Sequence, residues 1–169
     1  MKPTLKYLML FVTSGIVCLS TSIATTAAAW ETRTHPSACM TLGGAPIDLA
    51  FGIQNDGAAP MVVLCAARDE TGAAKQTTTA LNIHGYDDTT VGSVIVAQCR
   101  SLAFATGGAC GAGVSTSSPG LGNFALSVPV AGFWNANTAT DFGYVFISVP
   151  AKQGSAFRSI VRGVYQAGT

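Results

Sequence analysis

Two histidines, His35 and His84, are the first candidates for acid–base chemistry near neutral pH in this chain of 169 residues. His84 precedes Asp87 and Asp88, so a carboxylate could orient its imidazole as in a catalytic triad. The sequence has no G-x-S-x-G turn to present a nucleophilic serine beside it. We therefore predict that His84 is a strand-end histidine facing solvent, and we assign no catalytic residue.

Carboxylates suggest two further kinds of site, and their spacing favours neither. Glu31 and Glu70 are the only glutamates, and both fall in a turn or in the N-terminal tail, which does not favour the paired acids of a glycoside hydrolase. Turn aspartates could bind Ca²⁺ but lack a D-x-D-x-D spacing; they are Asp56, Asp87, Asp88 and Asp141. We predict solvated turn carboxylates with no metal and no cofactor, and calcium at a turn stays an open alternative.

One loop combines aromatic and polar side chains more densely than any other segment. It supplies Phe133, Trp134, Asn135, Asn137 and Asp141. A flat aromatic ring beside amide and carboxylate groups is what a sugar-binding platform needs. We therefore predict that any ligand site lies at this loop, from Phe133 to Asp141, and not at His84. The alternative is that Phe133 and Trp134 cap the core from the loop.

The N-terminus has the pattern of a secretory signal peptide. Lys2 and Lys6 form a positive start, residues 8–19 form an apolar run, and Ala27-Ala28-Ala29 gives a cleavage pattern of small residues before Trp30. We predict cleavage between Ala29 and Trp30, which leaves residues 30–169 as one domain in the periplasm or the extracellular space.

Two alternatives to this processing stay open. Residues 22–24 offer a less favoured cleavage site. The uncharged stretch of residues 7–29 is long enough to span a membrane, but its second half is rich in Ser, Thr and Ala and is only weakly hydrophobic. No later segment approaches this length, so no membrane span is predicted in the mature chain.

The predicted export indicates that the cysteines of the mature chain form disulfides. Cys18 leaves with the leader, and an even number of four remains in an oxidising compartment, which predicts two disulfides. The four are Cys39, Cys65, Cys99 and Cys110. Sequence alone permits three pairings; we favour Cys39–Cys65 with Cys99–Cys110, the second closing a Gly-rich segment. A Cys65–Cys99 bridge stays open because both residues fall in predicted strands.

The composition excludes several functional classes. Only 10% of residues are charged and 49% are apolar, which argues against intrinsic disorder. The net charge of +1 includes Lys2 and Lys6, so removing these two charges leaves −1. No basic cluster remains, and nucleic-acid binding through a basic face is therefore not expected.

The elements that must position these residues are strands, because apolar residues alternate with period two and helical periodicity is missing. Turn residues separate seven predicted strands, at residues 47–53, 60–68, 77–86, 91–102, 122–129, 142–150 and 158–166. Residues 105–120 are predicted to form a long loop. This spacing predicts an all-β fold: an antiparallel β-sandwich, jelly-roll or immunoglobulin-like, of about seven to eight strands with two disulfides.

Several short motifs resemble those of a group of secreted bacterial proteins without assigned activity. The matching segments are Val62–Asp69 (V-x-C-x-x-R-D from Val63), Ile83–Asp88 (I-x-x-x-D-D), Val96–Leu102 (V-x-x-C-x-x-L), Tyr144–Pro150 and the terminal strand from Ser159. The resemblance implies a secreted, disulfide-bonded β-sandwich and no known activity. The group often has a cysteine shortly before the proline of the penultimate strand, where this chain has Phe146-Ile147-Ser148; Cys110 would replace it as the partner of Cys99.

These observations together favour a secreted, non-enzymatic β-sandwich that acts as a surface-interaction or ligand-binding module, with an extracellular glycan as one possible ligand. The first alternative is an extracellular structural or self-assembling subunit that associates through strand edges, since low charge leaves the outer strands poorly protected. A secreted hydrolase or inhibitor is the least favoured class.

Overall fold

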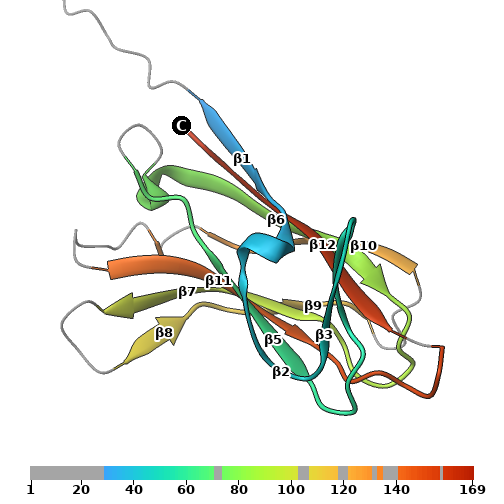
Figure 1. The fold of residues 1–169 in the computed structure, drawn as a ribbon. Coiled ribbons are helices and arrows are strands. Elements are labelled where there is room, and N and C mark those ends of the chain that lie inside the picture. The colour runs from blue at the N-terminus through green and yellow to red at the C-terminus, as the bar shows by residue number, and fades with distance from the viewer. Residues whose placement is uncertain are drawn as a thin grey trace, which may run out of the picture.

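A computed structural model describes residues 29–70, 74–102, 107–117, 122–130, 133–134, 141–156 and 158–169. The described chain is an antiparallel β-sandwich of two six-stranded sheets, which confirms the predicted fold class (Figure 1). The predicted leader lies outside the described residues, except for Ala29. Among the helices of the described part, none has the length and apolar character needed to cross a membrane.

The first sheet contains both ends of the predicted domain. Its strand order is β10 (Gly122–Ser127), β6 (Thr78–Asp87), β12 (Ser159–Gly168), β4 (Gly52–Asn55) and β3 (Pro46–Leu49), with β1 (Trp30–Thr34) also paired to β12. Trp30 lies opposite Gly168, so the start and the end of the domain are neighbours, as Figure 1 shows.

The second sheet packs beneath the first in the view of Figure 1. Its order is β2 (Met40–Gly43), β5 (Met61–Ala66), β11 (Asp141–Val149), β7 (Ile95–Leu102) and β8 (Gly108–Cys110), with β9 (Val114–Ser115) also paired to β7. Two short 3₁₀ helices, η1 (Pro36–Ala38) and η2 (Lys75–Thr77), lie in the connections.

The core lies between the sheets and is built from alternate residues of the strands. Val145, Ile147 and Val149 of β11 are buried, whereas the residues between them are partly exposed. Leu81 and Ile83 occupy the same inward positions in β6. Because side chains alternate across a strand, each sheet has a second, outward face whose chemistry is independent of the core.

The predicted strand at residues 47–53 is wrong in one respect: it is two strands, β3 and β4, joined by a turn at Ala50–Phe51. Gly52 has a φ of +154°, and a Cβ at this position would lie 2.3 Å from the Val161 carbonyl oxygen. The chain can therefore turn here only because residue 52 is glycine. As a result Phe51 lies in the turn and is exposed.

The number of strands also exceeds the expected seven to eight. Twelve are described, because β1 and β2 precede the first predicted strand, the segment at residues 46–55 is divided, and the predicted loop at 105–120 contains β8 and β9. These two short strands pair with β7. A segment rich in glycine and serine has low strand propensity, so its composition does not predict a strand. Here pairing with β7 makes the two short segments strands.

The disulfides are Cys39–Cys65 and Cys99–Cys110, which confirms the favoured pairing. Cys99 and Cys110 lie directly opposite each other on β7 and β8, so the second bridge fastens the edge strand β8 to the sheet. Cys65 instead points into the core from β5.

Candidate functional site

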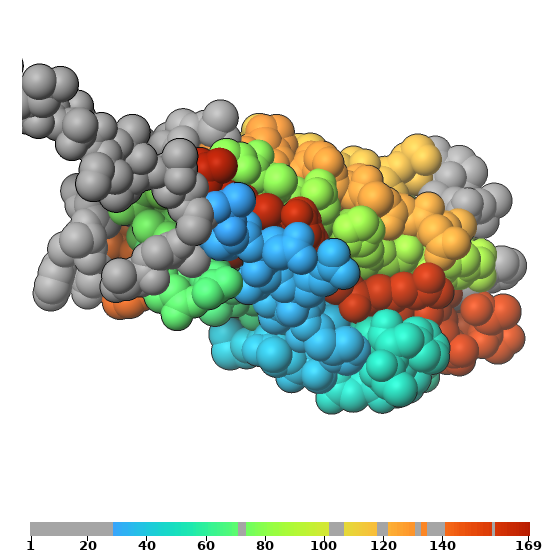
Figure 2. Space-filling model, turned by 90° about the horizontal axis from the view of Figure 1, so that it is seen from above, coloured from blue at the N-terminus to red at the C-terminus, as the bar shows by residue number. Residues whose placement is uncertain are grey.

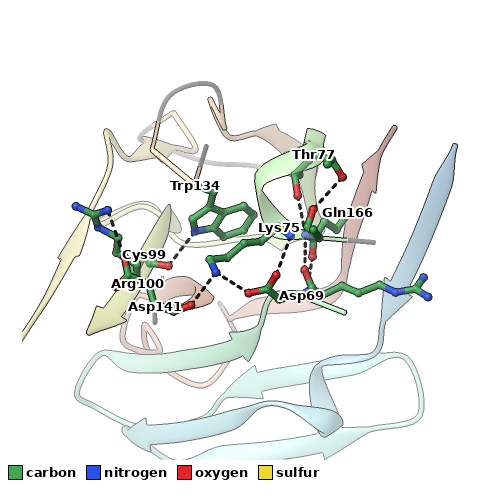
Figure 3. A network of polar contacts seen from close by, with 11 residues as sticks. Asp69, Lys75, Thr77, Cys99, Arg100, Trp134, Asp141 and Gln166 are labelled. Carbon is green, nitrogen blue, oxygen red and sulfur yellow. Dashed lines mark hydrogen bonds and ion pairs between the residues drawn. The ribbon is translucent and has the colours of Figure 1, made fainter. Parts of the chain in front are cut away.

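Trp134 of the predicted ligand loop is fully buried. Its Nε1 donates a hydrogen bond of 3.0 Å to the Cys99 carbonyl oxygen (Figure 3). The indole also lies against Gly143 of β11. A Cβ at residue 143 would lie 3.5 Å from the indole and 2.8 Å from Lys75. The prediction that Trp134 forms an exposed sugar platform is therefore wrong; the alternative, in which it caps the core, is confirmed.

The structure brings Phe133 and Asp141 close to Trp134 but commits both to contacts within the chain. The Arg100 guanidinium lies 5.2 Å from the centre of the Phe133 ring. Arg100 Nη1 also lies 3.4 Å from a carboxylate oxygen of the buried Asp141. The remaining predicted residues, Asn135 and Asn137, lie outside the described residues, so their part in a ligand site stays a prediction.

A buried lysine beside this cluster has no counterpart among the predicted site residues. Lys75 Nζ donates to Asp69 Oδ2 at 2.5 Å and to the Asp141 carbonyl oxygen at 2.7 Å (Figure 3). Asp69 Oδ1 also accepts from the Lys75 backbone amide at 3.1 Å. Both oxygen partners suit an ammonium donor, so the pair anchors η2 against the start of β11. A hollow of about 510 Å³ lies next to it.

The proposed His84–carboxylate pair does not form with Asp87. His84 points outward from β6, whereas Asp87 is buried. The Asp87 carboxylate accepts hydrogen bonds from three hydroxyl groups and one amide: Thr89 Oγ1 at 2.8 Å, Ser159 Oγ at 2.7 Å, Thr116 Oγ1 at 2.6 Å and the Thr89 amide at 3.2 Å. Asp87 is thus a buried polar junction between β6, β12 and the segment after β9, not the orienting acid of a catalytic pair. The prediction of solvated turn carboxylates is wrong for Asp87 and Asp141, which are buried strand residues.

Asp56 is likewise committed to protein partners. Its Oδ1 accepts from Lys152 Nζ at 3.0 Å and from Arg158 Nε at 2.8 Å. The hydrogen bond from Lys152, followed by the charges of Lys152 and Arg158, lowers the pKa of Asp56 below its ordinary value of 3.8. Within the described ranges, no group of three or more His, Cys, Asp or Glu side chains is arranged to hold a metal ion.

A groove of about 660 Å³ lies on the outer face of the first sheet. Figure 2 looks onto this face, where β10, β6, β12 and β1 lie side by side in orange, green, red and blue. The polar side chains that line the groove are Arg33 and His35 from the β1 end, Asn82 and His84 from β6, and Arg162 and Tyr165 from β12.

The backbone explains why this part of the face is hollow. The pairing of β12 with β6 shifts register between Val161 and Gly163, and Gly163 then lies opposite His84 with no side chain of its own. A Cβ at residue 163 would meet only the Thr34 carbonyl oxygen, at 3.9 Å, so the space above this glycine is open. Pro36 ends the β1 segment by turning the chain into η1 and leaves His35 at the rim.

Two arginines and an aromatic ring line the groove, and Glu31, which lies outside the lining, pairs with Arg33 Nη2 at 3.7 Å. The Arg33 guanidinium lies 5.8 Å from the centre of the Tyr165 ring. Arg162 lies 5.8 Å from the Tyr86 ring and donates to Asn123 Oδ1 at 2.9 Å. These contacts hold both guanidinium groups in defined positions at the surface. Among the described lining residues there is no Asp or Glu.

His84 was not predicted as a site residue because no nucleophile and no metal-spaced partner accompanies it along the chain. Its neighbours come from β1 and β12, at the two ends of the domain, and no local pattern reports that proximity. The available signal was the alternation in β6, where Asn82, His84 and Tyr86 occupy outward positions between buried ones. A polar stripe of this kind indicates an outward face but does not by itself distinguish a solvated face from a binding face.

Comparison with known proteins adds no relative from which a role could be transferred: no protein-family model matches the chain, and searches of curated proteins and of solved structures found no significant match.

Proposed function

We propose that this chain is a secreted, non-enzymatic binding module and that it holds an acidic extracellular saccharide in the groove on the first sheet. The observation that carries the proposal is the convergence of Arg33, Arg162, His35 and His84 around the open floor at Gly163. The proposal moves the ligand site from the loop at residues 133–141 to His84, because the indole of that loop is buried.

Each class of lining group matches one part of such a ligand. Guanidinium groups bind carboxylates and sulfates through paired hydrogen bonds, and Arg33 and Arg162 are both exposed. The Asn82 amide nitrogen offers a donor for sugar hydroxyls, while its Oδ1 accepts from Ser127 Oγ at 2.5 Å. The Tyr165 ring supplies an apolar surface for the C–H face of a sugar. The groove volume falls within the range of about 300–1,000 Å³ that is usual for small-molecule sites.

Binding without hydrolysis is favoured by the lining residues that the structure describes, since none of them is a carboxylic acid. Glycoside hydrolysis ordinarily uses two carboxyl groups across the scissile bond. Secretion is supported by the leader pattern before Trp30 and by two disulfides, which persist in oxidising compartments.

Calorimetric titration with oligogalacturonate tests the proposal, and its fully methyl-esterified form serves as the uncharged ligand control. We expect the acidic form alone to bind, and we expect Arg33→Gln and Arg162→Gln each to weaken binding by about tenfold, the value of one charge-assisted hydrogen bond. Both arginines are exposed, so the thermal melting temperature should not change.

Two further variants complete the design. Gly163→Leu fills the groove from its floor and is expected to abolish binding while the fold persists. Arg158→Gln removes an arginine outside the groove and is expected to leave affinity unchanged. Equal binding of the methyl ester, or unchanged affinity in both groove arginine variants, would contradict an acidic-saccharide site.

A further inference from the structure

The outer face of the second sheet carries no charged side chain among the described residues. Direct strand pairing identifies its members, because opposite residues of an antiparallel pair point to the same side. The apolar members are Met40 and Leu42 on β2, Val62 and Leu64 on β5, Phe142, Tyr144 and Phe146 on β11, and Ile95 and Ala97 on β7. We call this surface the apolar face.

Four large side chains of the apolar face are exposed, whereas its central members are half-buried and Ala97 is buried. Phe142 has 66% of its surface accessible and Met40 has 57%, and Leu42 and Ile95 are also exposed. A shallow hollow of about 300 Å³, lined by Met40, Leu64, Phe142 and Tyr144, lies on the same face. A contiguous exposed apolar surface of this kind is typical of an interaction site.

Within its described strands, the second sheet contains two charged residues, and both lie at one end. Arg100 and Asp141 pair with each other, and the Asp141 side chain is buried. The outer face of the first sheet is different, since it presents Arg33, Arg162 and Glu31. A partner that packed on the outer face of the first sheet would therefore have to desolvate charged side chains, whereas a partner on the apolar face would not.

This difference selects the partner. Packing the apolar face against the first sheet of another copy would strip water from Arg33 and Arg162 without providing counter-charges, which costs free energy. An anionic membrane surface would favour basic side chains on the contacting face, and the apolar face presents none among the described residues. Contact with the apolar face of a second copy desolvates no described charged side chain and requires no basic residues. We propose that two copies of this chain associate through their apolar faces as a symmetric dimer.

Such a dimer uses packing that the fold already employs. Two sheets stack face to face about 10 Å apart with interdigitating side chains, as within the sandwich itself. A twofold contact is self-complementary, so the same residues serve both copies. The proposal goes beyond ligand binding, and because the groove lies on the opposite sheet, the dimer would leave both grooves open.

Sedimentation velocity of the exported protein over a range of concentrations tests the proposal. We expect a dimer that dissociates on dilution. Phe142→Lys and Met40→Lys place a charge in the contact at two separate exposed positions and are each expected to raise the dimer dissociation constant by about tenfold or more. Phe51→Lys is the matched control, since Phe51 is also an exposed aromatic but lies between β3 and β4 of the first sheet.

Near-UV circular dichroism confirms that each variant is folded, and two independent positions prevent one misfolded variant from deciding the result. A protein that remains monomeric at all concentrations would overturn the proposal, as would a dimer that both lysine variants leave intact. A flotation assay with phosphatidylcholine–phosphatidylglycerol vesicles provides the remaining outcome: a monomer that floats with vesicles and loses this property in Phe142→Lys would replace the dimer with a membrane contact.

Discussion

At the scale of single residues, one position along a strand separates the core from the proposed site. Leu81 and Ile83 of β6 are buried between the sheets, whereas Asn82 and His84 line the groove on the outside. A shift of one residue in the register of β6 would exchange these sets. The groove therefore depends on the same packing that forms the core.

Trp134 gives the most direct test of the core at this scale. We expect Trp134→Ala to lower the free energy of unfolding by about 3–5 kcal/mol, because a large buried side chain is lost. Trp134→Phe keeps most of the apolar volume and loses the bond to the Cys99 carbonyl oxygen, so a smaller loss of about 1–2 kcal/mol is expected. Urea denaturation measures both. A loss below about 1 kcal/mol for the alanine variant would indicate an exposed indole.

Asp56 is expected to make the stability of the fold depend on pH. Its pKa is lowered in the folded protein by Lys152 and Arg158, so ionised Asp56 stabilises the fold above the ordinary value of 3.8, and this contribution is lost as the pH falls through the lower folded value. We expect Asp56→Asn to be less stable than the wild type at neutral pH and the difference to close in acid. Denaturation curves across this range measure it; a difference that is independent of pH would contradict the ion pairs.

Residue-level chemistry was only partly predictable. Two disulfides followed from the predicted export and the even count of cysteines, whereas the choice among three pairings was a preference, which the structure confirms. The burial of Trp134 did not follow, because an aromatic residue in a loop has the same composition signal whether it points into the core or into solvent. The ion pair of Lys75 with Asp69 was also missed, since a lone lysine gives no sign of being buried.

At the scale of elements, the Lys75–Asp69 pair holds the short helix η2 against β11. Asp69→Ala would leave the buried ammonium with only the Asp141 carbonyl oxygen. Since Asp69 is 32% exposed, we expect a loss of about 2–3 kcal/mol, below the 3–5 kcal/mol of a fully buried pair. The double variant Lys75→Met/Asp69→Ala should be more stable than Asp69→Ala alone. Equal losses in chemical denaturation would show that the ammonium is not desolvated.

The predicted strands were strands in the structure, but their boundaries were wrong where a glycine or a disulfide determines the course of the backbone. Residues 47–53 alternate as one strand would, yet Gly52 permits a turn that periodicity does not reveal. The segment containing β8 has weak strand propensity, and its pairing is fastened by the bond from Cys110 to Cys99. Long-range constraints of this kind do not appear in local patterns.

At the scale of the whole molecule, the two outer faces have different roles in our proposals. The first sheet presents arginines and histidines around a groove, and the second presents an uncharged apolar surface. A dimer joined through the apolar faces would carry two outward grooves, so a polymeric saccharide could be held at two points and binding would strengthen through effective concentration. The few charged side chains of the described chain are therefore distributed unequally between the two outer faces.

The most direct measurement of the central claim is a map of backbone amide chemical shifts during titration with oligogalacturonate. We predict that the largest shifts occur at the groove strands β1, β6 and β12, centred on His84, Gly163 and Tyr165, and that the methyl ester produces none. Shifts centred on the segment from Phe133 to Asp141, or on the apolar face, would contradict a ligand site in the groove.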